Sequence, residues 1–194
     1  MRGPLPVLPF VLLSACAGTP ASGPAPAALP ATAPASPPAA GAPVPSAPEV
    51  GVGVTTREAI EAAVPAWAGE RASTQVDATA SAALARVAPG AEVIVVLGTW
   101  CGDSRREVPR LWRALEVAGE VPFSVRLVAV DRAKQAPGGE LEGLAIHYVP
   151  TFIVRRGGVE VGRIVEGAAE GLEVALGALL RGERSGVISL RGRS

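Results

Sequence analysis

The sequence contains few of the residues that build metal sites and disulfide scaffolds. It has two cysteines, Cys16 and Cys101, and a single histidine, His147. Two cysteines exclude a multi-disulfide scaffold, and one histidine without a cluster of further ligands argues against a zinc site. Lys and Arg balance Asp and Glu at 18 each, so net charge does not attract the chain to nucleic acid. We therefore expect no cofactor, no metal and no nucleic-acid partner.

The sequence also has no apolar run long enough to cross a bilayer. The apolar core of residues 5–13 is much shorter than the roughly 20 residues that a membrane-spanning helix needs. It follows a single positive charge, Arg2, so residues 1–16 are typical of a signal peptide. On one interpretation this is an ordinary signal peptide in which Cys16 is incidental.

The end of this segment, Leu13-Ser14-Ala15-Cys16, resembles the signal of bacterial lipoproteins. The resemblance implies that Cys16 becomes lipidated and N-terminal, and so anchors the protein to a membrane. Gly18 stands where an aspartate would retain such a protein at the inner membrane. The resemblance thus implies a lipid-anchored protein of the bacterial cell envelope, at the outer membrane and facing the periplasm.

Residues 17–54 consist largely of Ala, Pro, Ser, Gly and Thr. Such a composition buries too little apolar surface to offset the entropy of ordering, so we expect a disordered linker. Frequent prolines favour an extended chain. The linker therefore acts either as a tether that holds a domain away from a membrane or as a passive connection.

A reactive-thiol site is indicated around Cys101. The apolar, mostly β-branched run 93–97 is typical of a strand buried on both faces. After Cys101, apolar residues recur at helical spacing, at Val108, Leu111 and Leu115. Cys101 therefore lies where a strand passes into a helix N-terminus, and the free N–H groups and dipole there favour the nucleophilic thiolate.

The motif Trp100-Cys101-Gly102-Asp103-Ser104 resembles the active-site loop of the thioredoxin superfamily, with Ser104 in place of the second cysteine. Pro109 stands where that family has a helix proline, and Val149-Pro150-Thr151 resembles its cis-proline loop. The match covers roughly residues 90–181. It implies an α/β thioredoxin-like fold, with a central mixed β-sheet flanked by helices, preceded by the disordered tether. We place this domain at residues 55–184 and a flexible basic tail at 185–194.

By the same resemblance, Cys101 and Ser104 are the catalytic residues of a CxxS site. Trp100, Gly102 and Asp103, with Val149, Pro150 and Thr151, would contact the substrate. A serine cannot resolve a mixed disulfide, but we expect its hydroxyl to hydrogen-bond the Cys101 thiolate. The predicted activity is thiol–disulfide exchange through a single cysteine.

Charges near Cys101 act in opposite directions. Arg105 and Arg106 favour the Cys101 thiolate, and Asp103 opposes that thiolate. Alternatively, Asp103 serves only to stabilise the first turn of the helix. The family commonly has a buried acid six residues before the nucleophile, where this sequence has Val95. His147 either approaches the site as an acid–base group or is a surface residue.

Further elements follow from periodicity and capping signals. Thr55 and Glu58 fit a capping box for a first helix, which Pro65 ends, and Trp67 is expected to pack against that helix. A second helix is predicted over residues 77–87, with Asp77 as its N-cap. Strands are predicted at 123–130, 152–154 and 159–165, and a final helix from residue 172.

Two functions from different classes remain open. One is a membrane-tethered monothiol exchange protein, possessing no cofactor and acting as a monomer on protein or low-molecular-weight thiols and disulfides. The other is a non-catalytic thioredoxin-fold binding module or scaffold in the cell envelope. The missing second thiol and the missing buried acid at Val95 favour the second.

Overall fold

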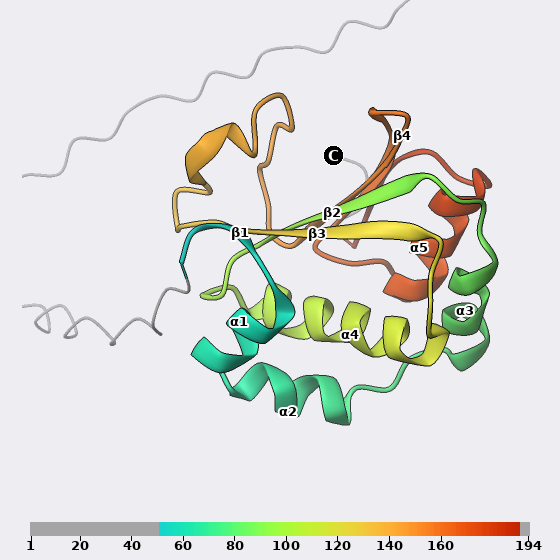
Figure 1. The fold of residues 1–194 in the computed structure, drawn as a ribbon, viewed down its shortest axis with the longest axis horizontal. Coiled ribbons are helices and arrows are strands. Elements are labelled where there is room, and N and C mark those ends of the chain that lie inside the picture. Colours follow the sequence, from blue (N-terminus) through green and yellow to red (C-terminus); the bar gives the residue numbers. More distant parts are fainter. Residues whose placement is uncertain (1–50, 191–194) are drawn as a thin grey trace, which may run out of the picture. The chain divides into compact units, whose positions relative to one another are not determined.

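The computed structural model describes residues 51–190, so the predicted signal peptide, Cys16 and nearly all of the predicted linker lie outside the described residues. The described part contains helices and strands in mixed order (Figure 1). In chain order they are β1 (Gly53–Thr55), α1 (Arg57–Ala63), α2 (Ala66–Ser73), α3 (Ala78–Ala83), the 3₁₀ turn η1 (Leu84–Arg86), β2 (Ala91–Leu97), α4 (Gly102–Ala118), β3 (Phe123–Ala129), the 3₁₀ turn η2 (Pro137–Gly139), β4 (Thr151–Arg156), β5 (Val159–Val165), α5 (Leu172–Arg181) and β6 (Gly186–Ser189).

The strands form one mixed sheet in the order β1-β3-β2-β4-β5-β6. β2 and β3 are parallel and joined through α4, whereas β4 pairs antiparallel with both β2 and its hairpin partner β5. A β-α-β unit followed by a β-hairpin and a helix is the arrangement of the thioredoxin-like fold. The predicted fold class, an α/β protein with a central mixed sheet flanked by helices, is confirmed.

Side chains on both faces of β2 are buried, as its run of β-branched residues predicts. Val93, Val95 and Leu97 belong to the core beneath the helices, and Ile94 and Val96 belong to a second core. Figure 1 shows α1, α2 and α4 on one side of the sheet and the segment between β3 and β4 on the other. That segment contributes Leu144 and Val149 to the second core. The strand before Cys101 is therefore held from both sides.

The first helix begins one residue later than the capping-box pattern predicts. Thr56 is its N-cap, and the Thr56 hydroxyl accepts a hydrogen bond from the Ala59 N–H at 3.2 Å. Thr55 instead ends β1, which pairs antiparallel with β3. The predicted boundary at residue 55 is thus corrected, because the ordered strand starts at Gly53, inside the segment assigned to the linker.

The remaining helices differ from prediction mainly in extent. Trp67 is fully buried, as expected, but it belongs to a separate helix, α2, for which Pro65 is the N-cap. Asp77 caps the next helix as predicted, by accepting from the Ala80 N–H at 2.9 Å. That helix ends at Ala83 and passes into η1. Within residues 51–190, no helix is both long and apolar enough to cross a membrane.

The expectation of a flexible tail from residue 185 is wrong for residues 186–189. These residues form β6, which pairs in parallel with β5 and places Ile188 beside Ile164. Ile188 is buried in the helix-side core, and this burial gives the strand its stability. Residues 191–194 lie outside the described residues.

A buried carboxylate joins α3, α4 and α5. Glu173 is 1% exposed and accepts hydrogen bonds from Arg110 Nε at 2.8 Å, from Arg110 Nη2 at 3.0 Å and from the Asp77 N–H at 2.7 Å. Burial alone would raise the pKa of Glu173, but Arg110 and then the Asp77 N–H hold that pKa below its ordinary value of 4.5.

This pKa shift predicts a stability that depends on acid. Because the pKa is lower in the folded chain, the contribution of Glu173 is complete above pH 4.5 and is lost as the pH falls through the folded value. Glu173→Gln should lower the free energy of unfolding by about 1–3 kcal/mol at neutral pH and less in acid. Urea unfolding at about pH 7, 5 and 3.5 measures this. The exposed Glu120→Gln is the control, and an equal loss at every pH would contradict the assignment.

Candidate functional site

Cys101 is the N-cap residue of the 17-residue helix α4. A tight turn connects the end of β2 to Cys101, and it is closed by the Cys101 N–H, which donates to the Gly98 carbonyl at 2.9 Å. The thiol is half-buried, and its Sγ–H donates to the Val149 carbonyl at 3.1 Å. The strand-to-helix position that the sequence predicts for this cysteine is confirmed, and its sulfur faces the segment before β4.

The Val149-Pro150-Thr151 segment lies against the thiol. The Val149–Pro150 peptide bond is cis, as the resemblance implied. The Thr151 hydroxyl donates to the Tyr148 carbonyl at 2.7 Å, and the Pro150 carbonyl accepts from the Glu166 N–H at 2.8 Å. This segment is therefore fixed on both sides of the proline, and Val149 offers its carbonyl to whatever lies at the sulfur.

Ser104 does not make the expected hydrogen bond to Cys101. It is fully buried, and its hydroxyl oxygen accepts from the Gly98 N–H at 3.2 Å. Among the hydrogen bonds of residues 51–190, none joins Ser104 to the thiol. Ser104 lies in the first turn of α4, facing the strand end rather than the sulfur. Its observed role is to fasten the turn between β2 and α4.

The Trp100 ring is fixed beside the turn. Its Nε1–H donates to the Val130 carbonyl at 3.1 Å, and the Arg132 guanidinium carbon lies 5.4 Å from the ring centroid. A Cβ on Gly98 would come within 2.7 Å of the ring, so glycine is required there by close approach. Gly102 is exposed at the start of α4 and has no neighbour that a Cβ would contact.

The arginines after Cys101 are neutralised by carboxylates, contrary to the expectation that they act on the thiol. Arg105 Nη2 lies 2.6 Å from a Glu70 oxygen. Arg106 pairs with both Asp103, at 2.9 Å, and Glu107, at 2.8 Å. Asp103 thus has a cationic partner one helical turn away. The sum of these charges near the sulfur is smaller than the sequence alone implies.

Two buried acids near the site were not predicted. Glu107 lies on the buried face of α4, three residues after Ser104, and Glu166 follows β5. The signal for Glu107 is its position among the inward-facing Ser104, Val108 and Leu111. Val95, six residues before Cys101, is fully buried in the core, so no acid stands at that position.

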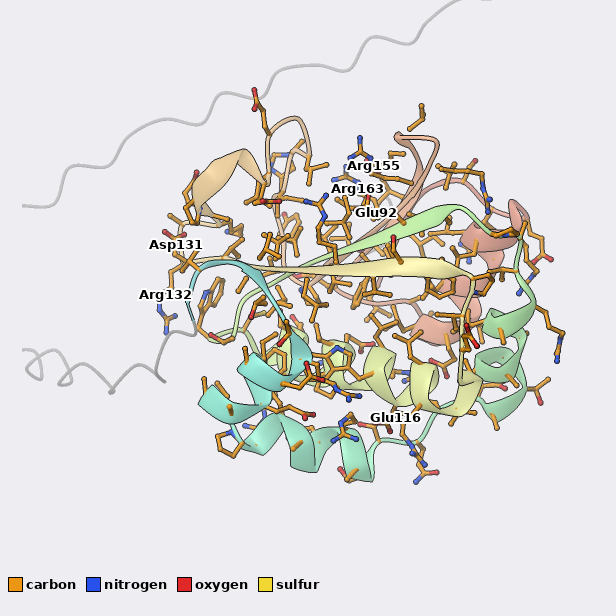
Figure 2. The ribbon with its side chains drawn as sticks, viewed as in Figure 1. Glu92, Glu116, Asp131, Arg132, Arg155 and Arg163 are labelled. Atoms are coloured by element: carbon orange, nitrogen blue, oxygen red, sulfur yellow. The ribbon has the colours of Figure 1, made fainter. Side chains whose placement is uncertain are left out.

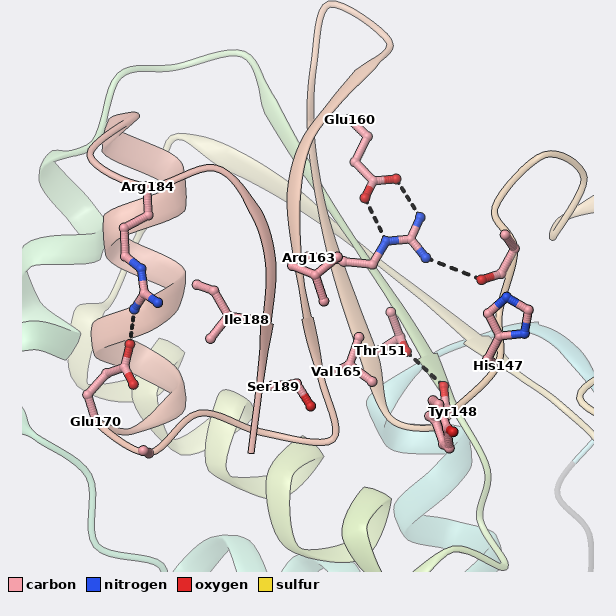
Figure 3. Close-up of a pocket in the computed structure, with 13 residues that line it drawn as sticks. His147, Tyr148, Thr151, Glu160, Arg163, Val165, Glu170, Arg184, Ile188 and Ser189 are labelled. Carbon is pink, nitrogen blue, oxygen red and sulfur yellow. Dashed lines mark hydrogen bonds and ion pairs between the residues drawn. The ribbon is translucent and has the colours of Figure 1, made fainter. Parts of the chain in front are cut away.

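A cavity of about 930 Å³ opens beside the Val149-Pro150-Thr151 segment (Figure 3). Thr151, Val165 and Ser189 line it, and they form one row across β4, β5 and β6. Two ion pairs lie at its walls, Arg163 with Glu160 and Arg184 with Glu170. The cavity exists in this form because β6 extends the sheet.

His147 lines this cavity rather than the thiol. It is exposed and stands beside Tyr148 in the cavity wall (Figure 3). None of the hydrogen bonds described for residues 51–190 joins it to Cys101. Within the same residues, no group of three or more His, Cys, Asp or Glu side chains is arranged to hold a metal ion.

Comparisons with known proteins give structural likenesses only. No family model matches the sequence, and no curated protein matches it. The chain is similar to a crystal structure of a protein of unknown function from Pseudomonas aeruginosa, at 19% identity and a TM-score of 0.41, covering 64% of this chain and 74% of that one. It is also similar to Trxlp from Edwardsiella tarda, at 24% identity and a TM-score of 0.38, covering 55% of this chain and 94% of that one. A third similar structure is an HIV epitope scaffold, at 18% identity and a TM-score of 0.41, covering 66% and 79%.

Proposed function

We propose that this thioredoxin-fold protein carries out thiol–disulfide exchange through Cys101 as its single nucleophile. The observation that carries this function is the position of Cys101 at the N-cap of α4, 3.1 Å from the Val149 carbonyl. At a helix N-terminus, free backbone N–H groups are available to negative charge that develops on the sulfur during exchange. The Val149 backbone can pair with an extended substrate segment as a strand would.

The exchange proceeds in two balanced steps. The Cys101 thiolate attacks one sulfur of a substrate disulfide, forming a mixed disulfide and releasing the other half as a thiolate, which takes up a proton. A thiol from the substrate or from a second molecule then attacks the mixed disulfide and regenerates Cys101. Ser104 takes no part in the second step, because a hydroxyl cannot displace a thiolate from sulfur. The substrates are protein or low-molecular-weight disulfides and thiols.

The location is inferred from the N-terminal sequence. Lipidation of Cys16 would anchor the chain to the outer membrane, facing the periplasm, with the domain acting as a monomer. Cys16 would then be a thioether and could not pair with Cys101. The envelope is oxidising, so continued reduction needs an external thiol, whereas isomerisation uses a thiol of the substrate itself to release Cys101.

The experiment uses the full chain with Cys16→Ala, which leaves Cys101 as the sole thiol. The chain is mixed with 2-hydroxyethyl disulfide, a neutral probe, and the adduct is followed by intact mass. We expect one adduct per chain, formed at least about tenfold faster in the folded chain than in the same chain unfolded by guanidinium. Added thiol should remove the adduct, and Cys101→Ser should form none. Equal rates in the folded and unfolded chains would overturn the function.

The alternative is a non-catalytic binding module or scaffold. It is favoured by one observation, that the Ser104 hydroxyl is engaged by the Gly98 N–H instead of the thiol. A binding module predicts a slow native reaction, no faster than that of the unfolded chain. The same experiment therefore separates the two functions.

A further inference from the structure

The Arg132 guanidinium lies over the ring of Trp100, and within residues 51–190 it has no acidic ion-pair partner. We propose that Arg132 is a specificity-determining residue, which makes Cys101 react preferentially with disulfides that carry a carboxylate close to the attacked sulfur. This inference rests on the proposed exchange activity and names the class of its substrate. It is carried by the placement of Arg132 on Trp100, the residue directly before Cys101.

Trp100 provides a fixed platform for the cation. Its ring is held by the Nε1–H bond to the Val130 carbonyl and lies close against Gly98, where no side chain intervenes. The Arg132 guanidinium carbon lies 5.4 Å from the ring centroid, within the range of a cation–π contact. Such a contact orients the guanidinium but leaves its N–H groups available to an anion.

A closed turn holds Arg132 in this place. The Asp131 carboxylate accepts from the Gln135 N–H at 2.8 Å, and the Asp131 N–H donates to the Gln135 carbonyl at 3.1 Å. The Lys134 N–H also donates to the Asp131 carbonyl, at 3.0 Å. Figure 2 shows Asp131 and Arg132 beside each other at the end of β3. Asp131 is thus used by the turn and forms no ion pair with its neighbour.

The other arginines around the site have carboxylate partners. Arg105 pairs with Glu70, Arg106 with Asp103 and Glu107, and Arg110 with Glu173. In the described part of the chain, no carboxylate lies within ion-pairing distance of Arg132. An anionic substrate can therefore bind Arg132 without displacing a carboxylate. The turn already holds the Arg132 guanidinium in position, so binding does not have to order it.

Lys134, in the same turn, is also without an acidic ion-pair partner among residues 51–190. It adds to the positive potential, and the cation–π contact on the Trp100 ring is that of Arg132. Electrostatic attraction of this kind raises the rate of encounter and is screened by salt. A guanidinium additionally binds a carboxylate through two parallel hydrogen bonds, so Arg132 should contribute more than Lys134.

The test compares three small symmetric disulfides of similar length, using the full chain with Cys16→Ala. They are 3,3′-dithiodipropionate, which is anionic, cystamine, which is cationic, and neutral 2-hydroxyethyl disulfide. In each case the Cys101 thiolate displaces one half as a thiolate and keeps the other in a mixed disulfide, so the chemistry is the same. For each variant, the rate with a charged disulfide is divided by the rate with the neutral disulfide. That ratio is then divided by the same ratio measured for a free cysteine peptide.

We expect the anionic disulfide to be favoured over the cationic one by about tenfold at low salt, and this ratio should fall in about 1 M salt. Arg132→Met should lower the ratio to near one, and Arg132→Lys should restore part of it. The control is Arg86→Met, which removes another exposed arginine before β2, at the opposite end of that strand from Trp100; it should leave the ratio unchanged.

The outcomes separate the two proposals. If Arg132→Met retains the wild-type ratio, or if Arg86→Met lowers it equally, the role of Arg132 is wrong while the exchange activity stands. If the folded chain reacts with the neutral disulfide no faster than the unfolded chain, the exchange function itself fails. A wild-type ratio near one also overturns the specificity.

Discussion

Replacing Ser104 with cysteine should give the chain an internal disulfide with Cys101 and an ability to reduce insulin that the parent lacks. The two positions are the N-cap and third residue of α4, and side chains three apart on a helix are neighbours within the span of a disulfide. A second thiol so placed resolves the mixed disulfide within the molecule, which is far faster than capture by a free thiol. With dithiothreitol as the electron donor, we expect the Ser104→Cys chain to reduce insulin at least about tenfold faster than the background rate seen with the parent chain.

The measurement needs a control that changes position 104 without adding a thiol. Ser104→Ala also removes the acceptor of the buried Gly98 N–H, so it reports the structural effect of the change alone, and it should gain no reductase activity. Both variants are made with Cys16→Ala. The disulfide requires the side chain at position 104 to turn from the Gly98 N–H towards Cys101. Should the Ser104→Cys chain keep two free thiols after exposure to oxidised glutathione, that side chain would stay facing Gly98 and the expected disulfide and reductase activity would be wrong.

The same variant should differ in stability between its redox states. In the reduced form the Gly98 N–H loses an oxygen acceptor in a buried place, which costs about 1–3 kcal/mol. In the oxidised form the disulfide constrains the unfolded chain and offsets part of this loss. Urea unfolding of the two forms, beside Ser104→Ala, would reveal the difference.

Truncating Trp67 should have the largest effect on stability. Trp67 is fully buried and packs against Trp112, with ring centroids 5.9 Å apart. Through this contact α2 is attached to α4, the helix that carries Cys101. Trp67→Ala removes the whole ring from the core and should lower the free energy of unfolding by about 3–5 kcal/mol.

A second variant isolates the cause. Within the described residues, the buried Nε1–H of Trp67 has no hydrogen-bond partner, and such an orphan donor costs about 1–3 kcal/mol. Trp67→Phe keeps most of the packing and removes that donor, so it should lose much less than Trp67→Ala. Urea midpoints of the two variants at 25 °C decide the matter. An equal loss in both would mean that the indole N–H stabilises the fold.

The centre of this fold was predictable because one physical signal dominated each element. The β-branched run that became β2 is buried on both faces, and the helical spacing of Val108 and Leu111 located α4. Asp77 was predicted as a cap because a side-chain oxygen before a helix can satisfy a free N–H. These interactions are local, so a short window of sequence contains them.

The sequence could not predict elements that depend on distant partners. β1 and β6 have three and four residues, and each exists through pairing with a strand elsewhere in the chain. α2 contains Gly69 and has a proline, Pro65, as its N-cap, so its sequence pattern is weak, and the burial of Trp67 holds it in place.

The charges at the candidate site show the same limit. Arg105 meets Glu70 across 35 positions of sequence, and Arg132 reaches Trp100 across 32. Nothing in the spacing of those residues indicates which arginine is neutralised and which is free. The Ser104 hydroxyl was likewise assigned to the thiol because Cys101 is near in sequence, although the Gly98 N–H at the end of the preceding strand is its partner.

The short strands at the two margins of the sheet also bear on self-association. Long, flat edge strands recruit strands from other molecules, whereas edge strands of three or four residues offer few free backbone groups to a second copy. β6 occupies the outer side of residues 162–165 in β5. A chain cut before Gly186 would uncover that side of β5 and, with it, a template for aggregation. The last residues of the domain therefore serve its solubility as well as its cavity.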